Sequence, residues 1–262
     1  MTDYHVHIGQ FKNAYYYADR VFSALKSVGF DEAWFSSTTS CVYCKESSAA
    51  KADKRIYANA PTARELFENI LYEIQEALKA AKEIGVKARM LYWVVPDIHL
   101  SDGSGISIEY AMNSADYSGF KIHTRAQNWD FNDARIFKLA EDIFSFAEKY
   151  AKLILIHCDD DHSPRLFEHF IAGHPKALIQ IAHLRPISDT IYMLSHYSNV
   201  VADTSMASRE NVEKIEKAGF SNKLRYGTDF PITHWHSCKP DYDPSVNELV
   251  QNVQQLYAMV KR

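Results

Sequence analysis

The sequence predicts an α/β fold, a (β/α)8 TIM barrel that residues 1–262 form as one domain. Three observations favour it. Short apolar segments alternate with longer amphipathic segments along the chain. Eight of the short segments have the character of strands. The chain of 262 residues is close to the ~250 residues typical of such a barrel. An open sheet that binds a nucleotide is less favoured, because no glycine-rich phosphate loop follows the first strand.

The eight predicted strands are apolar stretches of six to ten residues. They are TDYHVHI (2–8), DEAWFSS (31–37), VKARMLYWVV (86–95), SGFKIH (118–123), KLILIHC (152–158), ALIQIAH (177–183), NVVADTS (199–205) and KLRYGTD (223–229). Because parallel strands need long crossover connections, the segments between them are expected to be helical.

Three of the connecting or terminal segments predict helices directly. In the first, apolar residues recur every three or four positions from Leu66 to Leu78. It begins with a capping box, Thr62 to Glu65, and Gly85 follows its end. The second covers about 134–150, and the third runs from about residue 245 to the C-terminus. The irregular stretch 36–60 is predicted to be the longest loop, an insertion on the catalytic face.

Composition and charge exclude several classes of partner. The formal net charge is -4, with both signs mixed and no basic block, so nucleic acid is not an expected partner. No apolar run approaches the ~20 residues that span a bilayer, and the first residues lack a secretory signal pattern. We therefore expect a cytoplasmic protein that acts on a small molecule, with a homodimer as a further expectation. Four cysteines in a chain of this length do not form a disulfide framework.

Ionisable side chains gather at the carboxyl ends of the predicted strands, where such barrels carry their active sites. The residues are His5, His7, Lys121, His123, His157, His183 and Asp229. His5 and His7 are two apart, so on a strand their side chains share a face. Burying several such groups is costly unless they are paired or bind a metal. A divalent cation bound by these groups would explain why they gather there. Imidazole with carboxylate suits Zn²⁺, with Mn²⁺, Fe²⁺ and Ni²⁺ as alternatives.

The same motifs resemble the amidohydrolase superfamily along the full chain. They are HVH on the first strand, GFKIH on the fourth, LIHC on the fifth, IAH on the sixth and YGTDFP on the eighth. The resemblance is closest to the branch of metal-dependent TIM-barrel hydrolases that also contains decarboxylases. It implies that His5, His7, His157 and Asp229 hold one metal ion. His183 is then a further ligand or a free imidazole that polarises the substrate.

Relatives with two ions use a carbamylated lysine on the fourth strand as a bridge, and Lys121 stands at that place. The alternative is that Lys121 pairs with a substrate carboxylate as an ammonium. One ion is favoured and two remain open. Strand six continues HLRP, where relatives often carry small glycines, so Arg185 adds a cation and puts the transfer of a relative's substrate in doubt.

The resulting hypothesis is a metal-dependent hydrolase that cleaves a C–N or C–O bond in a small, carboxylate-bearing molecule with a metal-activated water. Asp229 is the expected general base and His183 the expected electrophile or acid. Lys121, His123, Arg125 and Arg185 are the expected substrate-binding residues, since cationic side chains can clamp an anionic group.

Other functions stay open at this point. A metal-dependent decarboxylase of an unsaturated acid shares the same ligands, so ligand motifs cannot separate it from a hydrolase. A barrel that binds a ligand without turnover is the non-enzymatic alternative. Deoxyribonucleases of the TatD type also begin with His-x-His, but they favour a glutamate where this chain has Lys121. The roles of Cys41 with Cys44 and of His234 with His236 are left open.

Overall fold

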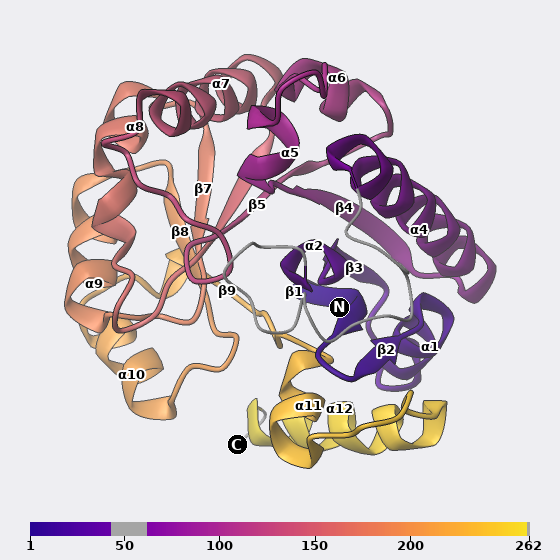
Figure 1. Ribbon diagram of the computed structural model, residues 1–262. Helices are drawn as coiled ribbons and strands as arrows, with labels where there is room; N and C mark the ends of the chain where they lie inside the picture. Colours follow the sequence, from indigo (N-terminus) through magenta and orange to yellow (C-terminus); the bar gives the residue numbers. More distant parts are fainter. Residues whose placement is uncertain (43–61, 261–262) are drawn as a thin grey trace. The chain divides into compact units, whose positions relative to one another are not determined.

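The computed structural model (Figure 1) describes residues 1–42 and 62–260. The chain divides into two compact units. The first unit comprises Met1–Met90 and Thr228–Arg262, and the second comprises Leu91–Gly227. All eight predicted strands are present, in several cases shorter than predicted, and one additional strand was not predicted.

The first unit contains a mixed sheet with helices. Its elements are β1 (Thr2–Phe11), β2 (Ala14–Tyr16), α1 (Ala18–Ser27), β3 (Glu32–Ser37), α2 (Thr39–Val42), α4 (Ala63–Ile84), the start of β4 (Lys87–Trp93), α11 (Ile232–Cys238) and α12 (Val246–Val260). The parallel strands β1, β3 and β4 lie in that order, and β2 adds to the other edge of β1 in the antiparallel direction. β1 is buried almost throughout, which places its polar side chains in the interior.

Helix α4 begins and ends where the sequence predicted. The Thr62 hydroxyl accepts a hydrogen bond from the Glu65 N–H, and the Glu65 carboxylate accepts one from the Thr62 N–H. Gly85 ends the helix in the left-handed conformation, with φ of 78°, which glycine adopts without steric cost. The helix turns its apolar stripe, including Ile70 and Ile74, into the unit.

Two parts of the first unit differ from the prediction. The additional strand, β2, carries Tyr15 and Tyr16 and pairs back onto β1 as a hairpin. In the stretch predicted as a loop from 36 to 60, Ser36 and Ser37 complete β3, and residues 39–42 form α2. Residues 43–60 of that stretch, with Cys44, lie outside the described residues.

The second unit is a parallel sheet flanked by helices (Figure 1). Its elements are the end of β4, α5 (Pro96–Leu100), α6 (Ile108–Asn113), β5 (Gly119–His123), α7 (Ala134–Tyr150), β6 (Leu153–His157), a 3-10 turn (Pro164–Phe167), α8 (Glu168–Gly173), β7 (Leu178–Ile181), α9 (Ile187–His196), β8 (Val200–Asp203), α10 (Arg209–Lys217), a second 3-10 turn (Ser221–Lys223) and β9 (Leu224–Arg225). The strands follow the chain order from β4 to β9. Strands that read as continuous apolar runs, such as β6, are buried on both faces.

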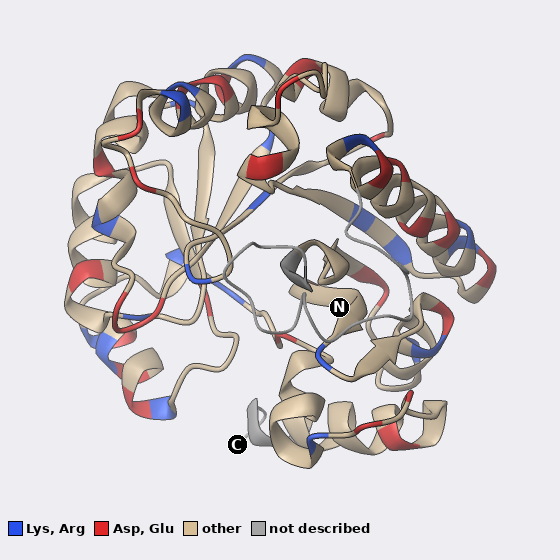
Figure 2. Ribbon diagram, in the orientation of Figure 1, with Lys and Arg blue, Asp and Glu red and all other residues tan. Residues whose placement is uncertain are grey.

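Helix α10 of the second unit carries ion pairs along its surface. Figure 2 shows acidic and basic residues along α10, where Arg209 pairs with Glu213 and Lys214 with Glu210 at i,i+4 spacing. Such exposed pairs contribute little to stability, because water and salt screen them. Among the described residues, no helix is both long enough and apolar enough to cross a lipid bilayer.

Candidate functional site

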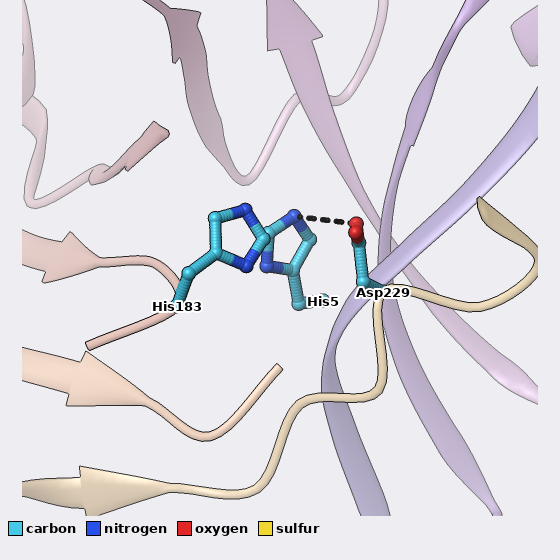
Figure 3. A group of neighbouring side chains, drawn as sticks. All are labelled: His5, His183 and Asp229. Carbon is cyan, nitrogen blue, oxygen red and sulfur yellow. Dashed lines mark ion pairs between the residues drawn. The ribbon is translucent and has the colours of Figure 1, made fainter. Parts of the chain in front are cut away.

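A carboxylate and two imidazoles meet in the first unit. The Nε2 atom of His7 lies 3.0 Å from Oδ1 of Asp229, and Nε2 of His5 lies 3.4 Å from the same oxygen. Figure 3 shows the pair of His5 and Asp229. All three side chains are buried, and His5 is fully inaccessible to solvent. Three donor atoms of the kinds that bind divalent cations therefore converge on one point.

The backbone brings Asp229 to β1. The Asp229 N–H donates to the His5 carbonyl at 2.9 Å, and the His7 N–H donates to the Phe230 carbonyl at 2.8 Å. The sequence predicted that a strand runs to Asp229, but β9 ends at Arg225. Asp229 instead lies in a turn with φ of 56°, a left-handed conformation that is uncommon for residues other than glycine and that aspartate adopts more often than most.

Asp3 holds this turn against the start of β1. Its buried carboxylate accepts hydrogen bonds from the Thr228 N–H at 3.1 Å, the Thr228 hydroxyl at 2.6 Å and the His5 N–H at 3.0 Å. Ser36 on β3 makes a comparable contact, since its Oγ lies 3.1 Å from Nδ1 of His7. Both groups support the residues that meet at Asp229, and the strand-end pattern singled out neither of them.

A second group of histidines lies within the second unit. Nδ1 of His157, at the end of β6, is 3.0 Å from Nε2 of His183, which follows β7 (His183 is drawn in Figure 3). The His123 and His157 rings stack with their centroids 3.8 Å apart, because Cα positions of these residues are paired between β5 and β6. Lys121 is buried two residues before His123, and its ammonium lies 5.8 Å from the centre of the Trp93 ring.

Asp159 is an acidic neighbour of His157 that the sequence did not indicate. Its Oδ2 lies 3.5 Å from Nε2 of His157 and 2.8 Å from Nε of Arg125, and its Oδ1 lies 2.8 Å from Nδ1 of His162. Burial raises the pKa of the Asp159 carboxyl, but hydrogen bonds from His157, His162 and the Asp161 N–H outweigh it and hold the pKa well below its usual range. Asp159 is therefore an anion at neutral pH.

The predicted substrate-binding arginines occupy different settings. Arg125 is exposed and pairs with Asp159 and Asp161. Arg185 donates from Nη2 to the Met206 carbonyl at 3.0 Å.

The residues whose roles the sequence left open also differ in burial. His234 is buried in α11, with Nδ1 3.3 Å from the Tyr16 hydroxyl, and burial lowers its pKa. His236 and Cys238 are exposed. Cys41 falls in α2.

A buried polar chain behind His183 was also missed by the sequence prediction. The Gln180 amide donates to Asp203 at 2.8 Å, and the Ser205 hydroxyl donates to the other oxygen of the same carboxylate. Ser205 Oγ lies 2.9 Å from Nδ1 of His183. Asp203, Ser205 and Gln180 are fully buried. The available signal was the polar ending of VVADTS, an apolar strand that finishes with an acid and two hydroxyls.

The donor atoms in each unit fit a divalent cation such as Zn²⁺. Two nitrogens bound to one tetrahedral zinc at 2.0–2.1 Å lie about 3.3 Å apart. The spacing of 3.0 Å between His157 and His183 is near that value. So are the 3.0 and 3.4 Å that separate His7 and His5 from the Asp229 oxygen.

Comparisons with known proteins agree with the fold. The TatD family hydrolase of Entamoeba histolytica has a TM-score of 0.55 and 10% identity, over 87% of this chain and 73% of that one. The 2,6-dihydroxybenzoate decarboxylase of Rhizobium has a TM-score of 0.52 and 11% identity, over 99% and 98%. Tryptophan synthase from M. tuberculosis has a TM-score of 0.52 and 11% identity, over 100% and 94%. At such identities the likeness defines the fold class alone, and it confirms the predicted α/β TIM barrel.

The family of the protein follows from a separate comparison. The amidohydrolase family model matches residues 47–244, so the chain belongs to the amidohydrolase family, as its motifs predicted. The match includes His157, His183 and Asp229, whereas His5 and His7 precede it. No curated protein matches the chain. Hydrolases and decarboxylases both occur among the structural neighbours, so membership defines an enzyme family and leaves the reaction open.

Proposed function

We propose that the protein is a metal-dependent hydrolase that cleaves a C–N or C–O bond in a small, carboxylate-bearing molecule. His5, His7, His157 and Asp229 hold one divalent cation in this proposal, with Zn²⁺ as the first candidate. The observation that carries it is the convergence of His5 and His7 on one oxygen of Asp229 in a buried setting. A buried carboxylate with two imidazoles is costly without a proton or a cation to share.

A bound divalent cation lowers the pKa of a water ligand to about 7 and so supplies hydroxide at neutral pH. Asp229 is the general base of the proposal, because its carboxylate is held in a fixed turn by backbone hydrogen bonds to β1. Lys121 is the candidate for binding the substrate carboxylate, as a buried ammonium on β5. Two metal ions bridged by a carbamylated Lys121 are the alternative, and a mass increase on Lys121 would identify it.

The first experiment measures metal and activity together. The purified chain is analysed for metals, stripped with a chelator and reloaded with Zn²⁺, Mn²⁺, Fe²⁺ or Ni²⁺. Each form is assayed against a panel of N-acyl amino acids, lactones and carboxylate esters, and against unsaturated acids with detection of carbon dioxide. The proposal predicts about one metal ion per chain and hydrolysis that is lost on stripping and restored on reloading. Full hydrolytic activity in the stripped protein contradicts it.

The same panel separates the alternatives. Carbon dioxide released from an unsaturated acid, with no hydrolysis, would identify a decarboxylase and overturn the hydrolase. A chain that binds no metal at stoichiometric concentration would point to a barrel that binds a ligand without turnover.

A further inference from the structure

The polar chain behind His183 decides which of the two ring nitrogens carries the proton. Nδ1 of His183 lies 3.0 Å from the carbonyl oxygen of Ser205. A carbonyl oxygen only accepts hydrogen bonds, so this contact forms only when Nδ1 carries a proton.

The hydroxyl of Ser205 gives the same answer independently. Asp203 is buried and its carboxylate accepts from both the N–H and the hydroxyl of Ser205. A hydroxyl has one proton to donate. With that proton directed to Asp203, Ser205 Oγ can only accept from the Nδ1–H of His183, 2.9 Å away. Two acceptors therefore face Nδ1, and the neutral ring carries its lone pair on Nε2.

The second oxygen of Asp203 is also held in place. It accepts from the Gln180 amide at 2.8 Å, and the Gln180 carbonyl accepts from Nη1 of Arg225 at 3.1 Å. The two carboxylate oxygens are thereby held by Ser205 and by Gln180, and Arg225 on β9 in turn holds the Gln180 amide. His183 itself lies in a left-handed turn with φ of 69°, so its ring direction depends on these contacts as well as on the backbone.

We propose that Ser205 and Asp203 are positioning residues that hold His183 as the Nδ1–H tautomer and present its Nε2 lone pair as a metal ligand. His157 has the complementary arrangement, since its Nε2 faces Asp159 and its Nδ1 faces His183 at 3.0 Å. Two ring nitrogens this close repel each other unless a proton or a cation lies between them. The tautomer stands on hydrogen bonding alone, whereas the ligand role rests on the proposed function.

The test uses the full chain and two measurements. Long-range ¹H–¹⁵N spectra of the metal-free protein, with His183→Gln for assignment, report which nitrogen of His183 carries the proton. Competition with a coloured chelator gives the affinity for Zn²⁺. The expected results are a proton on Nδ1 in the wild type and an affinity for Zn²⁺ that falls about 10- to 100-fold in Ser205→Ala. Ser205→Thr, which keeps the hydroxyl, restores most of the loss.

The chain offers a matched control on its surface. Ser195 Oγ lies 2.9 Å from Nδ1 of His196, and that nitrogen also lies 2.9 Å from the Tyr192 carbonyl. This exposed serine–histidine pair repeats the local contacts of Ser205 and His183, so Ser195→Ala should leave the affinity for Zn²⁺ unchanged.

Two results overturn the inference: a proton on Nε2 of His183 in the wild type, or an affinity for Zn²⁺ in Ser205→Ala within twofold of the wild type. Failure of the wild type to bind Zn²⁺ at all refutes the proposed function and the ligand role, while the spectra still decide the tautomer.

Discussion

The two histidine groups use a carboxylate in different ways. In the first unit the Asp229 carboxylate contacts the imidazoles of His5 and His7 directly. In the second unit the Asp203 carboxylate reaches His183 through the hydroxyl of Ser205. A carboxylate that contacts imidazole directly can share a cation or a proton with it. A carboxylate committed to a hydroxyl, a backbone N–H and an amide fixes the direction of a ring instead.

His99 is an example of an imidazole with a structural role. Nδ1 of His99 faces the Ile106 carbonyl at 2.9 Å, as Nδ1 of His183 faces that of Ser205. Nε2 of His99, however, lies 3.0 Å from the Tyr92 hydroxyl, which can donate to it. Both nitrogens of His99 are satisfied by groups of opposite character, whereas Nε2 of His183 faces another imidazole. His99 therefore has a structural role, whereas the proposed function gives Nε2 of His183 the role of a ligand.

The largest effect is expected at Asp229. Asp229→Asn keeps the shape of the side chain and removes its charge, so both the general base and a metal ligand are lost. Hydrolysis of the substrate found in the panel should fall about 10²- to 10⁴-fold while the circular dichroism spectrum stays unchanged. Asp161→Asn, at an exposed carboxylate, is the control and should keep full activity. More than a tenth of wild-type activity in Asp229→Asn would exclude Asp229 as the base.

Zn²⁺ affinity should distinguish His7 from His123. Nε2 of His7 faces Asp229, so His7→Ala removes a proposed ligand and should weaken Zn²⁺ binding about 10³-fold. That loss is larger than the 10- to 100-fold typical of a group that only orients a ligand. His123 stacks on Trp93 and His157, and its Nδ1 accepts from the Ala126 N–H at 3.1 Å. His123→Ala should therefore keep the Zn²⁺ affinity within a few fold. Equal losses in the two variants would contradict the assignment.

Gly9 tests how closely the end of β1 is packed. Its φ is 89°, and a Cβ there would lie 2.6 Å from Oγ1 of Thr39 and 2.8 Å from Oε1 of Glu73. Gly9→Ala should lower the free energy of unfolding by about 3 kcal/mol, from the left-handed backbone and the clash together. Gly85→Ala, at a φ of 78° with open space around it, should cost about 1 kcal/mol. Urea unfolding of both variants checks this, and equal losses would show that Gly9 has room.

The smallest expected effect is a dependence of stability on pH from His99. Burial lowers its pKa from 6.5 to about 4, so the unfolded chain takes up a proton at higher pH than the folded one. The neutral His99 ring therefore contributes fully to the free energy of unfolding above pH 6.5, and this contribution is lost as the pH falls from 6.5 to about 4. It amounts to about 2 kcal/mol after allowance for partial exposure. Urea unfolding of the wild type and of His99→Asn is measured at pH 7.5 and 4.5. Between these pH values the free energy of unfolding should fall by that amount less in the variant than in the wild type. Equal losses would contradict it.

Elements that depend on local chemistry could be predicted from the sequence. The capping box at Thr62 and the left-handed Gly85 bounded α4 correctly, since both act within a few residues of the helix end. The β2 hairpin was missed because its pairing depends on β1 and its tyrosines also fit a helix start.

Within the site, the types of residue were easier to predict than their geometry. Histidines at strand ends stand out in the sequence, and the pattern at His5 and His7 was enough to expect both on one face. The turn that carries Asp229 and the hydrogen bonds of Ser205 depend on contacts between distant segments. Asp203 and Asp3 were passed over because an acid at the end or the start of a strand can equally well be solvated.

The most direct test of the account is a crystal structure of the zinc-loaded protein with anomalous data on both sides of the zinc edge. The account predicts one zinc ion per chain, bound by His5, His7, His157 and Asp229 together with Nε2 of His183. Zinc-saturated crystals without an anomalous peak at these side chains, or with the ion held by other residues, would contradict it.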